Sequence, residues 1–135
     1  MKYVLDTNAV SALMKGEAAV IRKLEQVARS EVAVPQPVFA EIAYGIQRLP
    51  RSKRRDALQG RFDLVRSEIA GALWSDVVSD SFGSIKATLE RRGERIEDFD
   101  VAVAAHAVAV GAVLVTANVK HMVRIAGVEL EDWSE

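Results

Sequence analysis

The sequence contains no cysteine among its 135 residues, and this absence excludes disulfide bonds, thiol catalysis, zinc–thiolate sites and iron–sulfur clusters. A surplus of basic residues is also missing, because 18 Lys and Arg stand against 19 Asp and Glu, for a formal net charge of −1. Without an overall positive field, any contact with a nucleic acid must be local. A chain without cysteine also fits a reducing cytoplasm, which is where we expect this protein to act.

Long apolar runs are missing as well. The longest apolar stretch, Val101 to Val115, is interrupted by His106 and Gly111 and is shorter than the ~20 residues that span a bilayer. Asp6 stands where a secretory signal needs an apolar stretch, so we expect neither export nor membrane contact. Half of the residues are apolar and 27% are charged, which is typical of a globular protein, and the length predicts one domain over residues 1–135.

Short apolar strands alternate with amphipathic helical segments along the chain. This alternation predicts an α/β fold with a central, mainly parallel sheet, helices on both faces, and ligands bound at the carboxyl ends of the strands. The segment from Asp98 to Val110 is apolar almost all round, which indicates a buried helix that ends at Gly111. The predicted strands cover residues 3–5, 32–34, 72–78 and 112–115, and the predicted helices cover residues 9–14, 17–29, 38–49, 51–69, 81–92 and 98–110.

Two acidic residues border the predicted core. Asp6 follows the first strand directly, so its carboxylate either points into the crevice above the sheet or caps the next helix. Glu41 lies beside Val38 at the edge of the apolar stripe of its helix, and Gly45, one turn on, removes side-chain bulk next to it. A surface glutamate with a glycine kept for packing is the alternative interpretation.

Two further acids open the buried helix. The helical line from Asp100 continues through Val103 and Ala107, so Asp100 faces the apolar interior, where an unpaired carboxylate is costly. Capping of the positive helix end explains one of the two acids, but not both. Asp98 and Asp100 are about 200° apart on a regular helix, so they share a site only if the first turn is irregular.

Three acids from three separate elements are compatible with one another if a hard divalent cation offsets their charge. Carboxylate oxygens suit Mg²⁺ or Mn²⁺, and such sites often complete their ligands with water and phosphate. The cation would activate water and stabilise the charge that develops when a phosphodiester bond breaks. We interpret His106 as a hydrogen-bonded residue of the buried helix, and His121 as a loop residue or a phosphate contact.

The chain resembles the PIN-domain ribonucleases, and among them the VapC toxins of toxin–antitoxin pairs. The resemblance covers essentially the whole chain, and the order and spacing of its motifs make it specific. The motifs are Leu5 to Asn8, Phe39 to Gly45, Ile96 to Asp100 with Val103 to Ala107, and Leu114 to Asn118.

The resemblance implies that Asp6, Glu41 and Asp100 are the catalytic metal ligands. It also implies an endoribonuclease that cuts single-stranded RNA to 5′-phosphate and 3′-hydroxyl ends, forms a homodimer, and is inhibited by a VapB-type antitoxin that covers the acidic pocket. Asn118 falls where many relatives carry a fourth acid, and since an amide is neutral we expect one metal ion rather than two. The supporting residues implied by the motifs are Thr7 and Thr116, which orient the acids, together with Asn8, Asn118 and Asp98, the last as an alternative fourth carboxylate.

Two basic clusters are candidates for contact with the RNA backbone. Neither cluster contains aromatic residues for base stacking, so they would position RNA without reading its sequence. Solvated helix ends are the alternative interpretation, because Lys and Arg are favourable near helix C-termini. The first cluster comprises Arg48, Arg51, Lys53, Arg54 and Arg55, and the second comprises Arg91, Arg92 and Arg95.

Other functions fit the sequence less well. A haloacid-dehalogenase-like phosphatase needs a second Asp two residues after the first, where this chain has Asn8. A receiver-like signalling domain needs paired acids after the first strand and an acceptor Asp after a central strand, and Asp76 lies in a poor context for that role. A PIN domain used only for protein interaction would not need three intact acids.

Overall fold

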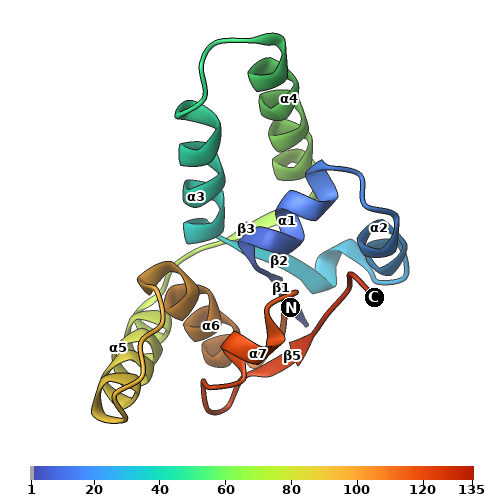
Figure 1. Ribbon diagram of the computed structural model, residues 1–135. Helices are drawn as coiled ribbons and strands as arrows, with labels where there is room; N and C mark the ends of the chain where they lie inside the picture. The colour runs from blue at the N-terminus through green and yellow to red at the C-terminus, as the bar shows by residue number, and fades with distance from the viewer. Residues whose placement is uncertain (1) are drawn as a thin grey trace.

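The centre of the structure is a parallel sheet. The computed structural model describes residues 2–135, and five strands within that range pair in the order β3-β2-β1-β4-β5 (Figure 1). All four strand pairings are parallel, which confirms the α/β class expected from the sequence. The strands are β1 (Tyr3–Leu5), β2 (Val32–Pro35), β3 (Ala70–Ala72), β4 (Val113–Val115) and β5 (Glu129–Glu131).

Helices cover both faces of the sheet. Successive strands are added from β1 through β2 to β3 toward one edge of the sheet, and then from β4 to β5 toward the other edge. Because connections between parallel strands are right-handed, the helices that precede β3 and the helices that follow it lie on opposite faces. Figure 1 shows α1, α3 and α4 above the sheet and α5 and α6 below it. The helices are α1 (Thr7–Met14), α2 (Ala18–Glu25), α3 (Gln36–Gln47), α4 (Lys53–Glu68), α5 (Asp76–Arg91), α6 (Asp98–Val110) and α7 (Val119–Met122), with a 3-10 turn, η1 (Arg29–Glu31), before β2.

The helix predicted to be buried is buried. Every residue of α6 from Val101 to Ala107 is shielded from solvent, and α6 packs against β1, β4, α3 and α5. Gly111 ends the helix with φ of 68°, a left-handed conformation that costs glycine little. None of the helices between residues 2 and 135 is long and apolar enough to cross a membrane.

The sequence interpretation was wrong between residues 70 and 92. The strand expected at 72–78 lies at Ala70–Ala72, and the helix expected from residue 81 begins at Asp76. Ser75 explains the early start of α5, because its hydroxyl accepts a hydrogen bond from the Val78 amide at 3.4 Å and caps the helix. The apolar residues that suggested a strand are partly on the surface, with Leu73 80% exposed.

Smaller differences concern the helix ends and the C-terminal segment. The second helix stops at Glu25 rather than residue 29, and the third at Gln47 rather than residue 49. β5 was not predicted, because a strand with the sequence Glu-Leu-Glu carries no strong β signal. It forms through its pairing with β4, in the register Leu114 to Leu130.

The topology brings distant residues to one edge of the sheet. β1 and β4 are neighbours in the register Leu5 to Val115, so Asp6 and Thr116, which follow them, lie side by side. α3 begins immediately after β2, at the same edge. α6 leads into β4, and a helix that packs antiparallel to the following strand also begins at this edge.

Candidate active site

Asp6 stands at the carboxyl end of the central strand and also caps the helix that follows. Its Oδ1 accepts a hydrogen bond from the Ala9 amide at 2.8 Å, so the capping interpretation is correct. Capping uses one oxygen and leaves the side chain at the edge of the sheet. Burial raises the pKa of the Asp6 carboxyl above its usual value, and the charge of Asp100 raises it further, while hydrogen bonds from Thr116 and Ala9 act in the opposite direction.

Glu41 joins the site through a bond to the first residue of α1. The Thr7 hydroxyl donates a short hydrogen bond to Glu41 Oε1, across 34 positions of sequence. Both side chains are half-buried. The contact holds the carboxylate of α3 at the start of α1, next to Asp6, which is the position expected for a ligand of a shared site.

Asp100 completes the group from the first turn of α6. Burial raises the pKa of its carboxyl, His121 lowers it, and the charges of Glu41 and Glu97 raise it again. Asp100 therefore lies within electrostatic reach of both Asp6 and Glu41. Within residues 2–135 no lysine or arginine forms an ion pair with any of the three, and His121, 3.6 Å from Asp100 Oδ2, is their single basic contact.

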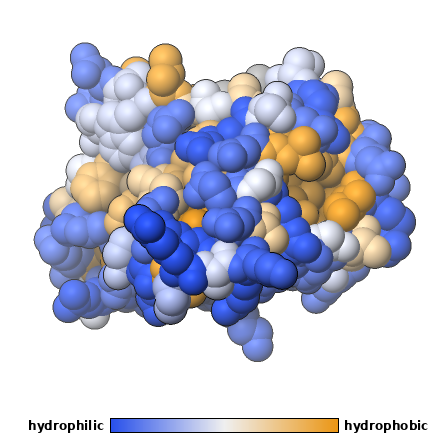
Figure 2. All heavy atoms as spheres, turned by 90° about the horizontal axis from the view of Figure 1, so that it is seen from above, coloured by the Kyte–Doolittle hydropathy of each residue, from blue (hydrophilic) through white to orange (hydrophobic). Residues whose placement is uncertain are grey.

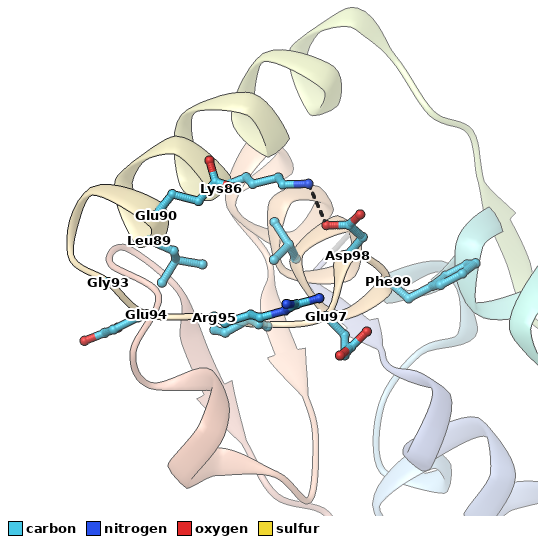
Figure 3. Close-up of a pocket in the computed structure, with 11 residues that line it drawn as sticks. Lys86, Leu89, Glu90, Gly93, Glu94, Arg95, Glu97, Asp98 and Phe99 are labelled. Atoms are coloured by element: carbon cyan, nitrogen blue, oxygen red, sulfur yellow. Dashed lines mark hydrogen bonds and ion pairs between the residues drawn. The ribbon is translucent and has the colours of Figure 1, made fainter.

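Asp98 is turned away from this group. Its Oδ1 lies 2.9 Å from Lys86 Nζ, and the carboxylate is 67% exposed. Figure 3 shows this ion pair at a cavity of about 730 Å³ between α5 and α6, whose lining includes none of the three neighbouring acids. Because the first turn of α6 is regular, Asp98 and Asp100 point to different sides of the helix.

Of the other supporting residues, Thr116 is buried and the two asparagines are exposed. Thr116 is 1% exposed, and its Oγ1 accepts a hydrogen bond from the Asn118 amide at 3.0 Å, which closes a tight turn after β4. Asn8 and Asn118 are exposed, and Asn118 stands at the start of α7, where its side chain makes no capping bond. Asn8 lines a small cavity with Thr116 and Trp133, on the side of the C-terminal segment.

Comparison with known proteins identifies the family to which the chain belongs. A family model described as "PIN domain" matches residues 3–128, which is most of the chain. The chain belongs to the PIN-domain family. The phosphatase and the receiver domain considered from the sequence are thereby excluded as families, and the resemblance seen in the sequence motifs is confirmed.

Full-length relatives of this PIN domain carry the name VapC. The chain is 33% identical to "Ribonuclease VapC2" of Rickettsia felis over the full length of both chains, and 27% identical to "tRNA(fMet)-specific endonuclease VapC" of Shigella flexneri over 99% of each. A solved structure of VapBC2 from Rickettsia felis, bound to a DNA fragment from its promoter, contains a chain with 30% identity and a TM-score of 0.88, which covers 98% of this chain and 99% of its own.

The acids of this PIN domain suit a hard divalent cation, although they do not form a closed cage. Over residues 2–135, no three His, Asp or Glu side chains are grouped tightly enough to hold a metal ion by themselves. Mg²⁺ does not require such a cage, because it is commonly held by one or two carboxylates together with waters and substrate phosphates. Burial and repulsion between acids raise the pKa values of Asp6 and Asp100, and neither forms an ion pair with a lysine or arginine of residues 2–135, so the donor set fits the ion.

Two of the basic residues line a groove that also contains Glu41. The groove, of about 370 Å³, lies between α1, α3 and α4, and its lining includes Thr7, Glu41, Gly45, Arg48 and Arg54. Figure 2 looks down on this side of the molecule and shows mainly hydrophilic atoms. This agrees with the exposure of α4, in which Phe62 is the one buried residue among those that the structure describes. Gly45 borders open space in this groove, because a Cβ added there would meet nothing within 4 Å, so no close contact requires glycine at this position.

The other basic residues do not gather at this groove. Arg51 and Lys53 are exposed, and Arg55 donates a hydrogen bond to Gln47 Oε1 at 2.6 Å. In the second cluster, Arg91 bonds to Thr88 of its own helix, Arg92 bonds to Glu94 and to the Arg124 carbonyl, and Arg95 lines the cavity of Figure 3. The structure therefore associates Arg48 and Arg54 of the first cluster with Glu41. The second cluster lies before the start of α6, and Arg95 lines the cavity on the side of Asp98.

The sequence interpretation missed Arg124, which lies close to the site, and misplaced His121. His121 belongs to the short helix α7 rather than to a loop, and it faces Asp100. Arg124 contacts His121 and was not considered. The spacing of three residues between them is a usable signal for neighbours on a helical turn, but nothing local indicates the contact with Asp100. His106 is buried as expected, yet its Nδ1 has no hydrogen-bond partner among the described residues.

Proposed function

We propose that this PIN domain is a divalent-metal-dependent endoribonuclease that acts as the toxin of a VapBC-type pair. The observation that carries the proposal is the convergence of Asp6, Glu41 and Asp100, from three separate elements, on one edge of the sheet, with no lysine or arginine paired to them in the described chain. Relatives over the full length are named ribonuclease or endonuclease, which supports hydrolysis of RNA.

The chain's own residues orient the reaction. Thr7 holds Glu41 through Oε1, which leaves Oε2 available to accept the proton of the attacking water. The cap on α1 fixes Asp6, and Asp100 faces it from α6. Asp6, Glu41 and Asp100 would supply the carboxylate ligands of Mg²⁺ or Mn²⁺, directly or through bound water, and the ion would activate water and offset the negative charge that develops on the phosphodiester.

The RNA strand approaches along the groove between α1, α3 and α4. Arg48 and Arg54 line this groove together with Glu41, so their guanidinium groups can contact phosphates on one side of the cleavage point. Since the net charge of the chain is −1, these local cations supply the attraction that the molecule as a whole does not. Such contacts position the backbone, and base recognition must come from elsewhere.

A VapB-type antitoxin is the proposed inhibitor, and a homodimer is the proposed assembly. A solved relative is a VapBC complex, which supports a partner of this kind. Three carboxylates without a lysine or arginine partner in residues 2–135 favour an inhibitor that brings a positive charge to them, such as an arginine side chain.

Cleavage of total RNA by the purified chain tests the activity. We expect cleavage with Mn²⁺ or Mg²⁺ and none with EDTA, with 5′-phosphate and 3′-hydroxyl ends. Asp6→Asn, Glu41→Gln and Asp100→Asn should each abolish it while circular dichroism remains unchanged, and Asp80→Asn, an exposed acid of α5, is the control. Full activity in any of the three variants would remove that residue from the site. Asp98→Asn should retain activity, because Asp98 is paired with Lys86.

Expression in a bacterial host tests the role as a toxin. We expect growth arrest when the chain is produced alone, relief when a cognate antitoxin is produced with it, and no arrest with Asp100→Asn. Harmless production of a folded chain that cleaves RNA in the test tube would contradict the role as a toxin and leave the nuclease assignment standing.

A further inference from the structure

A chain of contacts leads from Asp100 away from the proposed active site. His121 Nε2 lies 3.6 Å from Asp100 Oδ2, and on the other side of the ring His121 Nδ1 lies 2.7 Å from Arg124 Nη2. The imidazole therefore stands between a carboxylate and a guanidinium. It is 27% exposed and Asp100 is 44% exposed, so this arrangement lies at the rim of the site.

Arg124 is fixed from two directions. Its Nε donates to the His121 carbonyl at 3.2 Å, and its Nη2 donates to the Arg95 carbonyl at 3.2 Å. The Arg124 carbonyl in turn accepts a hydrogen bond from Arg92 Nη1 at 3.3 Å. The guanidinium thus ties α7 to the segment that precedes α6, which is the segment that sets the position of Asp100.

The guanidinium determines which nitrogen of the imidazole carries the proton. Arginine has donors only, so a close contact between Arg124 and Nδ1 requires Nδ1 to be the acceptor. In the neutral ring the proton then resides on Nε2, the nitrogen that faces Asp100. The distance of 3.6 Å between Nε2 and Asp100 Oδ2 is too long for a hydrogen bond, and a shift of about half an ångström would bring it into that range. Contacts of this kind often shorten when a site binds its substrate or metal.

We propose that His121, held in its Nε2–H tautomer by Arg124, is a positioning residue that orients the carboxylate of Asp100. The proposal rests on the proposed function, in which Asp100 is a metal ligand, and it deepens that function by naming the residues that hold this ligand in place. Partners of this kind fix the direction of a ligating group and increase its basicity. His121 itself is not assigned a contact with RNA or metal.

Nitrogen NMR of the metal-free protein tests the tautomer directly. With ¹⁵N-labelled protein at pH 8, two-bond couplings from the ring protons distinguish a protonated Nε2 from a protonated Nδ1. We expect His121 to be the Nε2–H tautomer in the wild type, and a mixture of tautomers in Arg124→Gln. A wild-type ring protonated on Nδ1 would overturn the proposal without any reference to activity.

Binding of Mn²⁺ in the absence of RNA tests the effect on Asp100. We expect His121→Ala to weaken Mn²⁺ binding by about 10-fold or more, as loss of such a partner usually does. His121→Gln should recover most of this affinity, because the glutamine amide presents an N–H close to the position of Nε2. Val123→Ala, at an exposed neighbouring position, is the matched control and should bind Mn²⁺ like the wild type.

The kinetics separate positioning from a structural role. His121→Ala should lower kcat for RNA cleavage with little change in KM, while the thermal midpoint stays near that of the wild type. If His121→Ala and the wild type bind Mn²⁺ equally and share the same kcat, the positioning role is wrong. That result is distinct from failure of the proposed function, in which Asp100→Asn would also leave Mn²⁺ binding and cleavage unchanged.

Discussion

The hydrogen bond between Thr7 and Glu41 offers a sharp test of how the site is built. Thr7→Val replaces the hydroxyl with a methyl group of nearly the same size, so the packing at the start of α1 is retained and the bond to Glu41 Oε1 is removed. Thr7→Ser keeps the hydroxyl and is the matched control. The pair of variants isolates one contact between α1 and α3.

The expected magnitude follows from the charge of the acceptor. A hydrogen bond to a charged group contributes about 1.5–3 kcal/mol, and each 1.36 kcal/mol corresponds to a tenfold change in rate, so Thr7→Val should lower kcat/KM by about 10- to 150-fold. The effect on the free energy of unfolding should be smaller, below about 1.5 kcal/mol, because both side chains are half-buried and water can replace the lost partner.

A fluorogenic RNA cleavage assay with Mn²⁺ measures kcat/KM, and urea unfolding measures stability for the same preparations. The decisive comparison is between the loss of rate and the loss of stability. If Thr7→Val cleaves RNA within threefold of Thr7→Ser, the orientation of Glu41 does not depend on Thr7, and the reasoning from this contact is refuted.

Three further predictions follow from other parts of the site and the core. Gly45→Ala should raise the free energy of unfolding by about 0.8–1 kcal/mol, since alanine favours the helix and its Cβ meets nothing. A lower free energy of unfolding for Gly45→Ala in urea would contradict that expectation. Gly45→Trp should fill the groove and reduce RNA cleavage. Asp6→Asn should raise the thermal midpoint of the metal-free protein at pH 7, because the raised pKa of Asp6 means that its ionised form opposes folding. Asparagine still caps α1, so the helix start is retained. In the same scan, Mn²⁺ should stabilise the wild type more than the variant. Burial lowers the pKa of His106 below its ordinary value of 6.5, so the unfolded chain takes up the proton first and stability should decline as the pH falls below that value. Urea unfolding at pH 7.5 and 5.5 should show a smaller decline in stability for His106→Leu than for the wild type. Equal declines would exclude His106 as the cause.

The parts of the fold that were predicted correctly are those in which local signals and burial agree. The strand before Asp6 and the all-apolar α6 are examples, and α6 ends at Gly111 as expected. The strand Ala70–Ala72 was misplaced because alanine and glycine have little preference for strands, and this segment becomes one only by pairing with β2. Pairing between distant segments is not visible in a local pattern.

The site also combines features that the local sequence predicts with contacts between distant residues that it does not. The sequence indicated Asp6 and Asp100 from their places at element boundaries, and the angle between Asp98 and Asp100 already predicted that a regular helix would separate them, as it does. The contact between Asp100 and His121 joins residues 21 positions apart on different elements, so no spacing rule indicated it.

The order of strands in the sheet has a consequence for how this scaffold tolerates change. Asp6 and Thr116 follow the two adjacent inner strands, and Glu41 follows the third inner strand, β2, through α3. Asp100 belongs to α6, which leads into the inner strand β4, and the outer strands β3 and β5 themselves contain none of the three acids. Insertions, affinity tags or loop grafts are therefore best placed beside the two outer strands. The chain can be lengthened there without moving the acids that lie at the inner strands.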